Sequence, residues 1–170
     1  MNIVVTDGKG GYHFRPDSTL NRELKDFYLP DSITGLRLTP CLYAKMTRSA
    51  KSVSKKFANR CFSEFDFGLL LDADNMPYNM ATTLDNSTFF GYNFLETDRL
   101  SDSSFILKIK VKEIYLAKNL TAGMLEEALV KVTALSSLRT GDLLAVSLPE
   151  TFQVKVGDCI EFGDSSFKIL

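Results

Sequence analysis

The fold is decided by the C-terminal stretch TGDLLAVSLPETFQVKVGDCIEFGDSSFKIL, residues 140–170. Its Gly-Asp pairs at 141–142, 157–158 and 163–164 separate four short apolar runs, at residues 143–146, 152–156, 159–162 and 167–170. Glycine tolerates a positive φ and aspartate hydrogen-bonds its own backbone, so these pairs are typical of turns between strands. Four strands so close together predict a compact β structure rather than a βαβ unit.

Most of the chain before this stretch also has the pattern of strands. We expect short strands at residues 2–5, 12–15 and 26–29, and a longer one over 35–46 in which Leu36, Leu38 and Leu42 share a face. Pro40 in the middle of the longer run implies a sheet edge or a bulge, because proline has no N–H to give to a neighbouring strand. Further strands are predicted at 62–71, 88–95 and 105–112.

Two segments have helical spacing. Apolar residues recur at helical intervals in residues 49–60, with Ser49 as a candidate N-cap. Residues 121–135 carry a clearer apolar stripe, formed by Leu125, Ala128, Leu129, Val132 and Leu135. The sequence therefore predicts a single domain over residues 1–170, mainly β (α+β), with two helices.

Composition narrows the function. With 170 residues, 45% of them hydrophobic, and a net charge of −1, the chain gives no general reason to expect nucleic acid or an anionic membrane as a partner. The longest apolar run, residues 67–71, is far too short to span a membrane. Three scattered cysteines (Cys41, Cys61 and Cys159) and no visible signal peptide lead us to expect reduced thiols and a cytoplasmic protein.

An acidic strand at residues 64–74 is the first candidate site. Its period of two places Glu64, Asp66, Asp72 and Asp74 on one face. A neighbouring pair such as Glu64 and Asp66 could bind Mg²⁺, which prefers oxygen ligands. Without a third ligand or a nearby base, we favour a half-buried strand with a solvated polar face.

A basic segment without acidic residues is the second candidate site. Its charges are Lys45, Arg48, Lys51, Lys55, Lys56 and Arg60. The segment could bind phosphate groups, but such a run is more often the solvated side of an amphipathic helix. Aromatic residues are not interleaved with the charges, which argues against nucleic acid.

Several motifs resemble the fumarylacetoacetate-hydrolase-like family. Residues 133–144, TALSSLRTGDLL, resemble the family's closing segment, in which a Gly-Asp pair precedes Thr-Gly-Thr-Pro and a second Gly-Asp pair. Residues 15–20, RPDSTL, resemble its Lys-Pro-x-Ser-x-Leu element, and residues 68–73, GLLLDA, resemble its Gly-x-Asp-x-Thr-Ala strand. The likeness covers nearly the whole chain in a shortened form and implies the family's rolled β-sandwich.

The resemblance also implies a chemistry whose side chains this sequence lacks. Family members hydrolyse or decarboxylate 2-oxo and 2,4-dioxo acids with Mg²⁺ or Mn²⁺, held by a Glu-x-Glu pair and a later Asp. The resemblance places these ligands at Leu36, Leu38 and Leu70, and a family lysine near Thr82. Leucine cannot coordinate such a cation, so we predict that the three leucines pack together as a filled-in core. A rival alignment places the Glu-x-Glu pair on residues 64–66.

Two function hypotheses follow. In the favoured one, the chain is a catalytically degenerate relative with no metal and no cofactor, which binds a partner subunit or binds a small acid through Arg15. In the alternative, it is a Mg²⁺- or Mn²⁺-dependent hydrolase or decarboxylase of acylpyruvates that uses Glu64 and Asp66. The resemblance implies a homodimer or a mixed oligomer with a paralogue.

Overall fold

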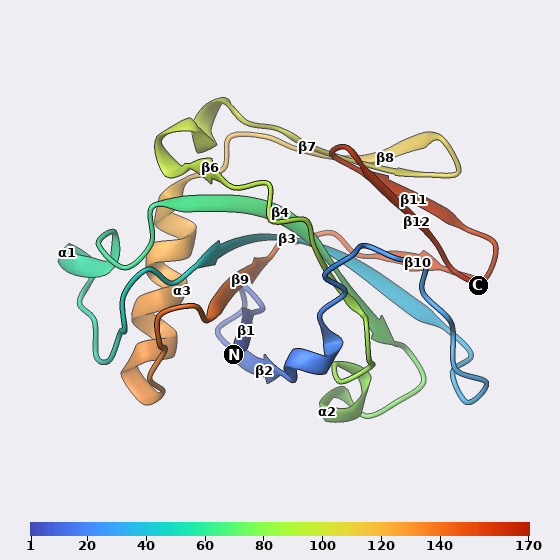
Figure 1. Ribbon diagram of the computed structural model, residues 1–170, viewed down its shortest axis with the longest axis horizontal. Helices are drawn as coiled ribbons and strands as arrows, with labels where there is room; N and C mark the ends of the chain where they lie inside the picture. Colours follow the sequence, from blue (N-terminus) through green and yellow to red (C-terminus); the bar gives the residue numbers. More distant parts are fainter.

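Two long antiparallel strands, β3 (Leu36–Lys45) and β4 (Glu64–Ala73), cross the middle of this computed structural model, which describes residues 1–170 (Figure 1). They belong to an eight-stranded sheet with the order β2-β1-β9-β3-β4-β5. In it β1 (Ile3–Thr6) runs parallel to β9 (Leu143–Ser147), and the other pairs are antiparallel. The remaining members are β2 (Tyr12–Arg15), β5 (Thr88–Phe90), β6 (Leu95–Glu96) beside β4, and β10 (Phe152–Val154) beside β3.

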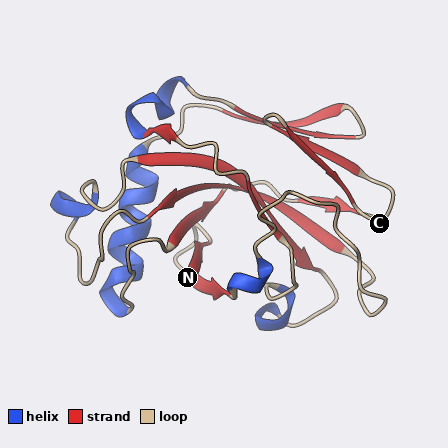
Figure 2. Cartoon of the chain, viewed as in Figure 1, coloured by secondary structure: helices blue, strands red, loops and turns tan.

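A second, four-stranded sheet and one long helix cover the same face of β3 and β4 (Figure 2). The small sheet has the order β12 (Ser165–Lys168), β11 (Cys159–Phe162), β7 (Phe105–Ile109) and β8 (Lys112–Ala117). Its apolar face packs on Leu36 and Leu38, whereas α3 (Ala122–Leu135) packs on Leu42 and Phe65 farther along the strands. The fold is thus mainly β with few helices, as predicted.

A third apolar cluster fills the opposite face of β3 and β4. There Leu70 and Tyr43 pack against Ile3 and Val5 of β1 and against residues of β9. The large sheet curls around this cluster, so that β1 and β9 lie beneath the central strands in Figure 1. The core therefore has two parts, one on each face of β3 and β4. Successive side chains of a strand point to opposite faces, so neighbouring residues of these strands enter different parts of the core.

The helical content is smaller than the sequence spacing predicts. Within residues 49–60 only α1 (Lys55–Ala58) is helical, and Ser54 rather than Ser49 holds the N-cap position. The other short helices are α2 (Tyr78–Ala81) and two 3₁₀ turns, Asp17–Thr19 and Thr97–Asp102. In α3 the predicted stripe is buried except for Leu135, which is 86% exposed. No helix is both long enough and apolar enough to cross a membrane.

Three predicted strand features are wrong. Pro40 marks neither an edge nor a bulge but lies between the parts of β3 that pair with β10 and with β9, so its missing N–H breaks no ladder bond. The predicted strand at 105–112 is a hairpin, whose turn residues Lys110 and Val111 have φ of 51° and 71°. Glycine or asparagine usually marks such a turn, so the sequence did not reveal it. Residues 26–29 form no strand, and only Phe27 makes an isolated bridge, to Ile169.

The Gly-Asp pairs act as predicted at the turns. Gly141, Gly157 and Gly163 have φ of 90°, 89° and 53°. Asp142 accepts hydrogen bonds from the backbone nitrogens of Asn2, at 2.7 Å, and Arg139, at 2.8 Å. Burial alone would raise the pKa of Asp142, but these hydrogen bonds outweigh it and lower the pKa. The carboxylate therefore joins the N-terminal strand to the C-terminal turns.

We expect Asp142→Asn to lower the free energy of unfolding at pH 7 by about 2 kcal/mol, because an amide cannot accept all of these bonds. The folded-state pKa lies below the unfolded one, so this stabilisation is present above pH ~4 and is lost as the pH falls through the folded-state pKa. Urea unfolding of both proteins at pH 7 and pH 3 should show the difference shrinking at the lower pH. An equal difference at both pH values would contradict the assignment.

Candidate functional site

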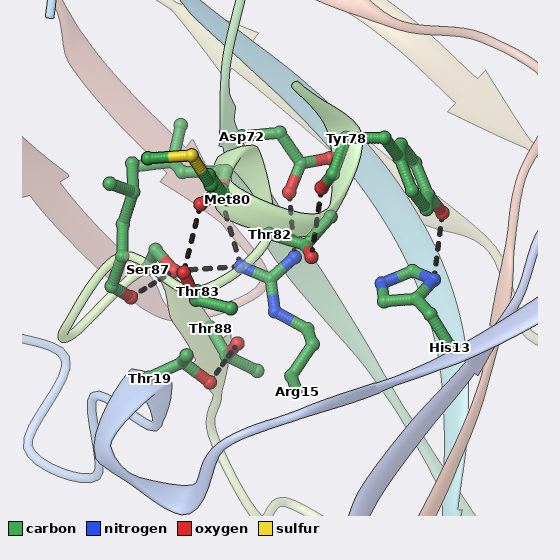
Figure 3. Close-up of polar contacts among 12 residues, drawn as sticks. His13, Arg15, Thr19, Asp72, Tyr78, Met80, Thr82, Thr83, Ser87 and Thr88 are labelled. Carbon is green, nitrogen blue, oxygen red and sulfur yellow. Dashed lines mark hydrogen bonds and ion pairs between the residues drawn. The ribbon is translucent and has the colours of Figure 1, made fainter. Parts of the chain in front are cut away.

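A polar cluster interrupts the apolar interior at the end of β4 (Figure 3). We call it the polar corner; its members are His13, Arg15, Asp72, Tyr78, Thr82 and Ser87. Arg15 is 2% exposed, and its guanidinium donates from Nη1 to Asp72 Oδ1 at 2.7 Å and from Nη2 to Ser87 Oγ at 2.7 Å. Nη2 also donates to the backbone carbonyl of Leu71 at 3.0 Å.

The strand alternation brings these side chains together. Asp72 points to the face of β4 opposite Leu69 and Leu71, whose side chains enter the core beneath the small sheet. Arg15 is the last residue of β2, and Pro16 follows it, so the strand ends with the guanidinium directed at Asp72. A buried ion pair of this kind leaves an uncompensated charge if either partner is removed. The polar corner therefore constrains where β2 lies relative to β4.

His13 and Tyr78 form the more open side of the polar corner. The Tyr78 hydroxyl lies 2.7 Å from His13 Nδ1, and the rings meet edge to face at 5.1 Å. Burial, and then the charge of Arg15, lower the pKa of His13, so the imidazole is neutral at pH 7. Thr82 is buried, and its hydroxyl donates to the carbonyl of Tyr78 at 3.2 Å, which closes α2. Its role in this conformation is structural.

A second arginine faces a second carboxylate beside the polar corner. Arg37 is the cross-strand partner of Asp72, and its Nη1 lies 3.8 Å from Asp74 Oδ1. Each acid near the end of β4 is therefore matched by an arginine, Asp72 by Arg15 and Asp74 by Arg37. The local charge is balanced without a metal ion.

The predicted packing of Leu36, Leu38 and Leu70 against one another is wrong. Leu36 and Leu38 lie in the cluster beneath the small sheet, whereas Leu70 lies in the cluster on the other side of β4. On β4, Leu71 and Ala73 share the face of Leu36 and Leu38, their cross-strand partners. Successive side chains of a strand point to opposite faces, so Leu70, next to Leu71, points to the other face. The three leucines therefore do not form one filled-in core.

Glu64 and Asp66 have different surroundings. Glu64 is exposed, and its cross-strand partner on β6 is another acidic residue, Glu96. Asp66 accepts hydrogen bonds from the Tyr43 hydroxyl at 2.8 Å and from the backbone nitrogens of Phe67 and Asn93, and burial raises its pKa. Its oxygens are thus engaged with donors from three neighbours, and the pair has no third acidic partner to complete a metal site.

Two further expectations need correction. Arg15 is buried and its charge is paired with Asp72, so its guanidinium is not free to contact a small acid in this structure. The acidic face of β4 is not uniformly solvated either, because Asp72 is 9% exposed. Sequence reasoning placed Asp72 on the correct face but missed its partner, which comes 57 residues earlier in the chain.

A divalent cation does not fit the side chains of the polar corner. Mg²⁺ and Mn²⁺ favour several oxygen ligands, with carboxylates among them. Asp72 has a guanidinium rather than a second carboxylate beside it, and no group of three or more His, Cys, Asp or Glu side chains gathers anywhere in the molecule. Two arginines near the available carboxylates would also repel a metal ion.

Comparison with known proteins identifies the fold. No protein-family model and no curated protein sequence matches this chain. Over 99% of its length the chain is similar to a protein from Yersinia pestis CO92 assigned to the fumarylacetoacetate hydrolase family, with a TM-score of 0.83, 12% identity and 92% of that chain covered. The fumarylpyruvate hydrolase of Pseudomonas aeruginosa, solved with Mn²⁺ and pyruvate, gives a TM-score of 0.81 at 12% identity, with 99% and 88% of the two chains covered.

A third solved structure agrees. The maleylpyruvate hydrolase of Sphingobium sp. SYK-6, solved with manganese(II) and pyruvate, gives a TM-score of 0.82 at 15% identity, with 99% of this chain and 70% of that one covered. This chain therefore has the fold of the fumarylacetoacetate hydrolase family, as the sequence resemblance implied. At such low identity the likeness concerns the fold alone.

Proposed function

We propose that this chain is a catalytically degenerate protein of the fumarylacetoacetate-hydrolase-like fold, which holds no catalytic Mg²⁺ or Mn²⁺ and acts by binding rather than by turnover. The observation that carries the proposal is the Arg15–Asp72 pair, with its 2.7 Å contact at the only buried carboxylate of the polar corner. A carboxylate that neutralises a buried arginine is not free to act as a metal ligand or a base.

The cross-strand register supports this proposal. A Glu-x-Glu pair and a later Asp can share one ion only if all three lie on the same face of neighbouring strands. On the face of β4 that holds Asp72, the facing positions of β3 are Arg37, opposite Asp72, and Thr39, opposite Leu70. Arginine and threonine therefore occupy the β3 positions at which such a site needs two carboxylates facing Asp72.

The alternative is a Mg²⁺- or Mn²⁺-dependent hydrolase or decarboxylase of 2,4-dioxo acids. It rests on the Pseudomonas and Sphingobium hydrolases, both solved with manganese and pyruvate. For this chain the remaining acidic candidates are Glu64 and Asp66, and the donors around Asp66 argue against them.

An acylpyruvate hydrolysis assay with added Mn²⁺ tests the choice. We expect no turnover above the uncatalysed rate, with the Pseudomonas fumarylpyruvate hydrolase as the positive control. If the protein turns over and both Glu64→Ala and Asp66→Ala abolish the activity, the hydrolase alternative replaces the proposal. Arg22→Ala, at an exposed position, serves as the matched surface control.

The binding partner that we propose is a second copy of this chain or a paralogue. Ile106 and Leu116 are directly opposite one another on β7 and β8, and they are 38% and 39% exposed. An apolar pair on an outer strand face, beside the open edge of β8, suits a partner subunit. Light scattering at micromolar concentration should give the mass of a dimer. The mass of a monomer would contradict the proposal of a homodimer.

A further inference from the structure

Charge is distributed unevenly along this chain. Residues 45–60 carry six basic and no acidic side chains, whereas the rest has 14 basic and 21 acidic residues, a balance of −7. Lys45 is the last residue of β3, and the other five basic residues lie in the segment that connects β3 to β4, which includes α1. All six side chains are exposed. Like charges held together repel one another, so a folded segment that gathers them is suited to an anionic ligand.

Three of these cations surround a surface hollow. Arg48, Lys51 and Arg60 line a hollow of about 530 Å³ together with exposed serine hydroxyls, and no acidic residue lines it. None of the three cations has an ion-pair partner; in this segment only Lys55 is paired, with Glu127 at 3.1 Å. Guanidinium, ammonium and hydroxyl donors around one space are the groups that bind phosphate oxygens.

The loop that carries the hollow is fixed in place. Ala50 exchanges backbone hydrogen bonds with Leu138 at 2.8 and 2.9 Å. Thr133 of α3 accepts from Ser52 N through its carbonyl at 2.8 Å and from Val53 N through its hydroxyl at 3.1 Å. The hollow is therefore present before any ligand arrives, which lowers the entropic cost of binding.

An exposed aromatic ring also lines the hollow, beside Arg60 and Lys56. Phe57 is 45% exposed, with the Arg60 guanidinium carbon 4.9 Å and Lys56 Nζ 5.8 Å from its ring centre. Exposed aromatic and guanidinium groups next to phosphate-binding charges provide a surface on which a nucleobase can stack. The expectation that no aromatic residue is interleaved with these charges is therefore wrong, because Phe57 lies between Lys56 and Arg60.

We propose that this basic hollow binds a nucleotide, with its phosphate groups against Arg48, Lys51 and Arg60 and its base against Phe57. A free nucleoside triphosphate and a nucleotide within a single strand share this chemistry. The proposal does not depend on the polar corner, which lies on other elements of the fold.

Calorimetric titration at 0.15 M salt with ATP, with inorganic pyrophosphate and with a dT10 oligonucleotide tests the proposal. We expect ATP binding to weaken about tenfold or more when Arg48, Lys51 and Arg60 are all changed to Gln, because charge-assisted contacts are lost. The matched control changes the exposed Lys9, Lys112 and Lys118 to Gln and should stay within about twofold of the parent. Equal thermal unfolding midpoints show that both variants are folded.

The remaining outcomes also decide the matter. Phe57→Ala should weaken ATP binding and leave pyrophosphate binding unchanged. If dT10 binds more tightly than ATP and competes with it, the nucleotide comes from a single strand. The proposal is overturned if the parent protein binds neither ATP nor dT10, if the triple variant binds ATP as well as the control does, or if Phe57→Ala has no effect.

Discussion

Arg15→Met is expected to lower the free energy of unfolding by about 3–5 kcal/mol, a large part of the stability of a domain of this size. Methionine keeps the apolar stem, but Asp72 then loses its buried counter-charge, and Ser87 and the carbonyl of Leu71 lose a donor. Urea unfolding at pH 7, with parallel thermal scans, measures the loss.

The control for Arg15→Met is Arg37→Met. Arg37 is partly exposed and lies 3.8 Å from its acidic partner, so its ion pair is screened by water. We expect a change below about 1 kcal/mol there. Adding Asp72→Asn to Arg15→Met should recover part of the lost stability, because it removes the unpaired charge. If Arg15→Met cost no more than Arg37→Met, the ion pair would not be the structural element that we describe.

Leu38→Glu is expected to lower the free energy of unfolding by about 4 kcal/mol or more, and so to leave the chain largely unfolded. Leu38 is fully buried in the core beneath the small sheet, on the face of β3 away from the polar corner. A carboxyl group there has no polar partner among the surrounding apolar side chains. Circular dichroism and urea unfolding at pH 7 record the result.

Leu38→Met is the matched control, since it keeps the volume and polarity of the site and should cost less than about 1.5 kcal/mol. Added Mn²⁺ should not rescue Leu38→Glu, even when it is combined with Leu36→Glu, because both side chains point away from Asp72. Stabilisation of the double variant by Mn²⁺ would show that these two positions do face a metal-binding space.

Local patterns in the sequence predicted the fold more accurately than they predicted the site. Glycine and aspartate control backbone geometry by themselves, so the turns at Gly141 and Gly157 could be predicted without knowing what packs around them. The turn at Lys110 and Val111 could not, because it uses residues that usually avoid a positive φ.

Predicting the site required knowledge of the register between strands. Alternation along β3 correctly grouped Leu36 with Leu38, but only the pairing of β3 with β4 shows that Leu70 lies on the other face. The Arg15–Asp72 contact joins strands that are not neighbours in the sheet, so no local pattern could predict it. The helix predicted over residues 49–60 is longer than the observed turn at 55–58. Met46 and Ala50 have helical spacing, but they lie in the loop after β3 and are buried from there.

Calorimetric titration of the protein with Mn²⁺ tests the central claim most directly, with the Pseudomonas fumarylpyruvate hydrolase as the positive control. Because Asp72 is paired with Arg15 and no acidic triad gathers, we predict no saturable heat of binding up to millimolar Mn²⁺. A saturable site with micromolar affinity that is lost in Asp72→Asn would contradict the account, because it would show that Asp72 is a metal ligand rather than the counter-charge of Arg15.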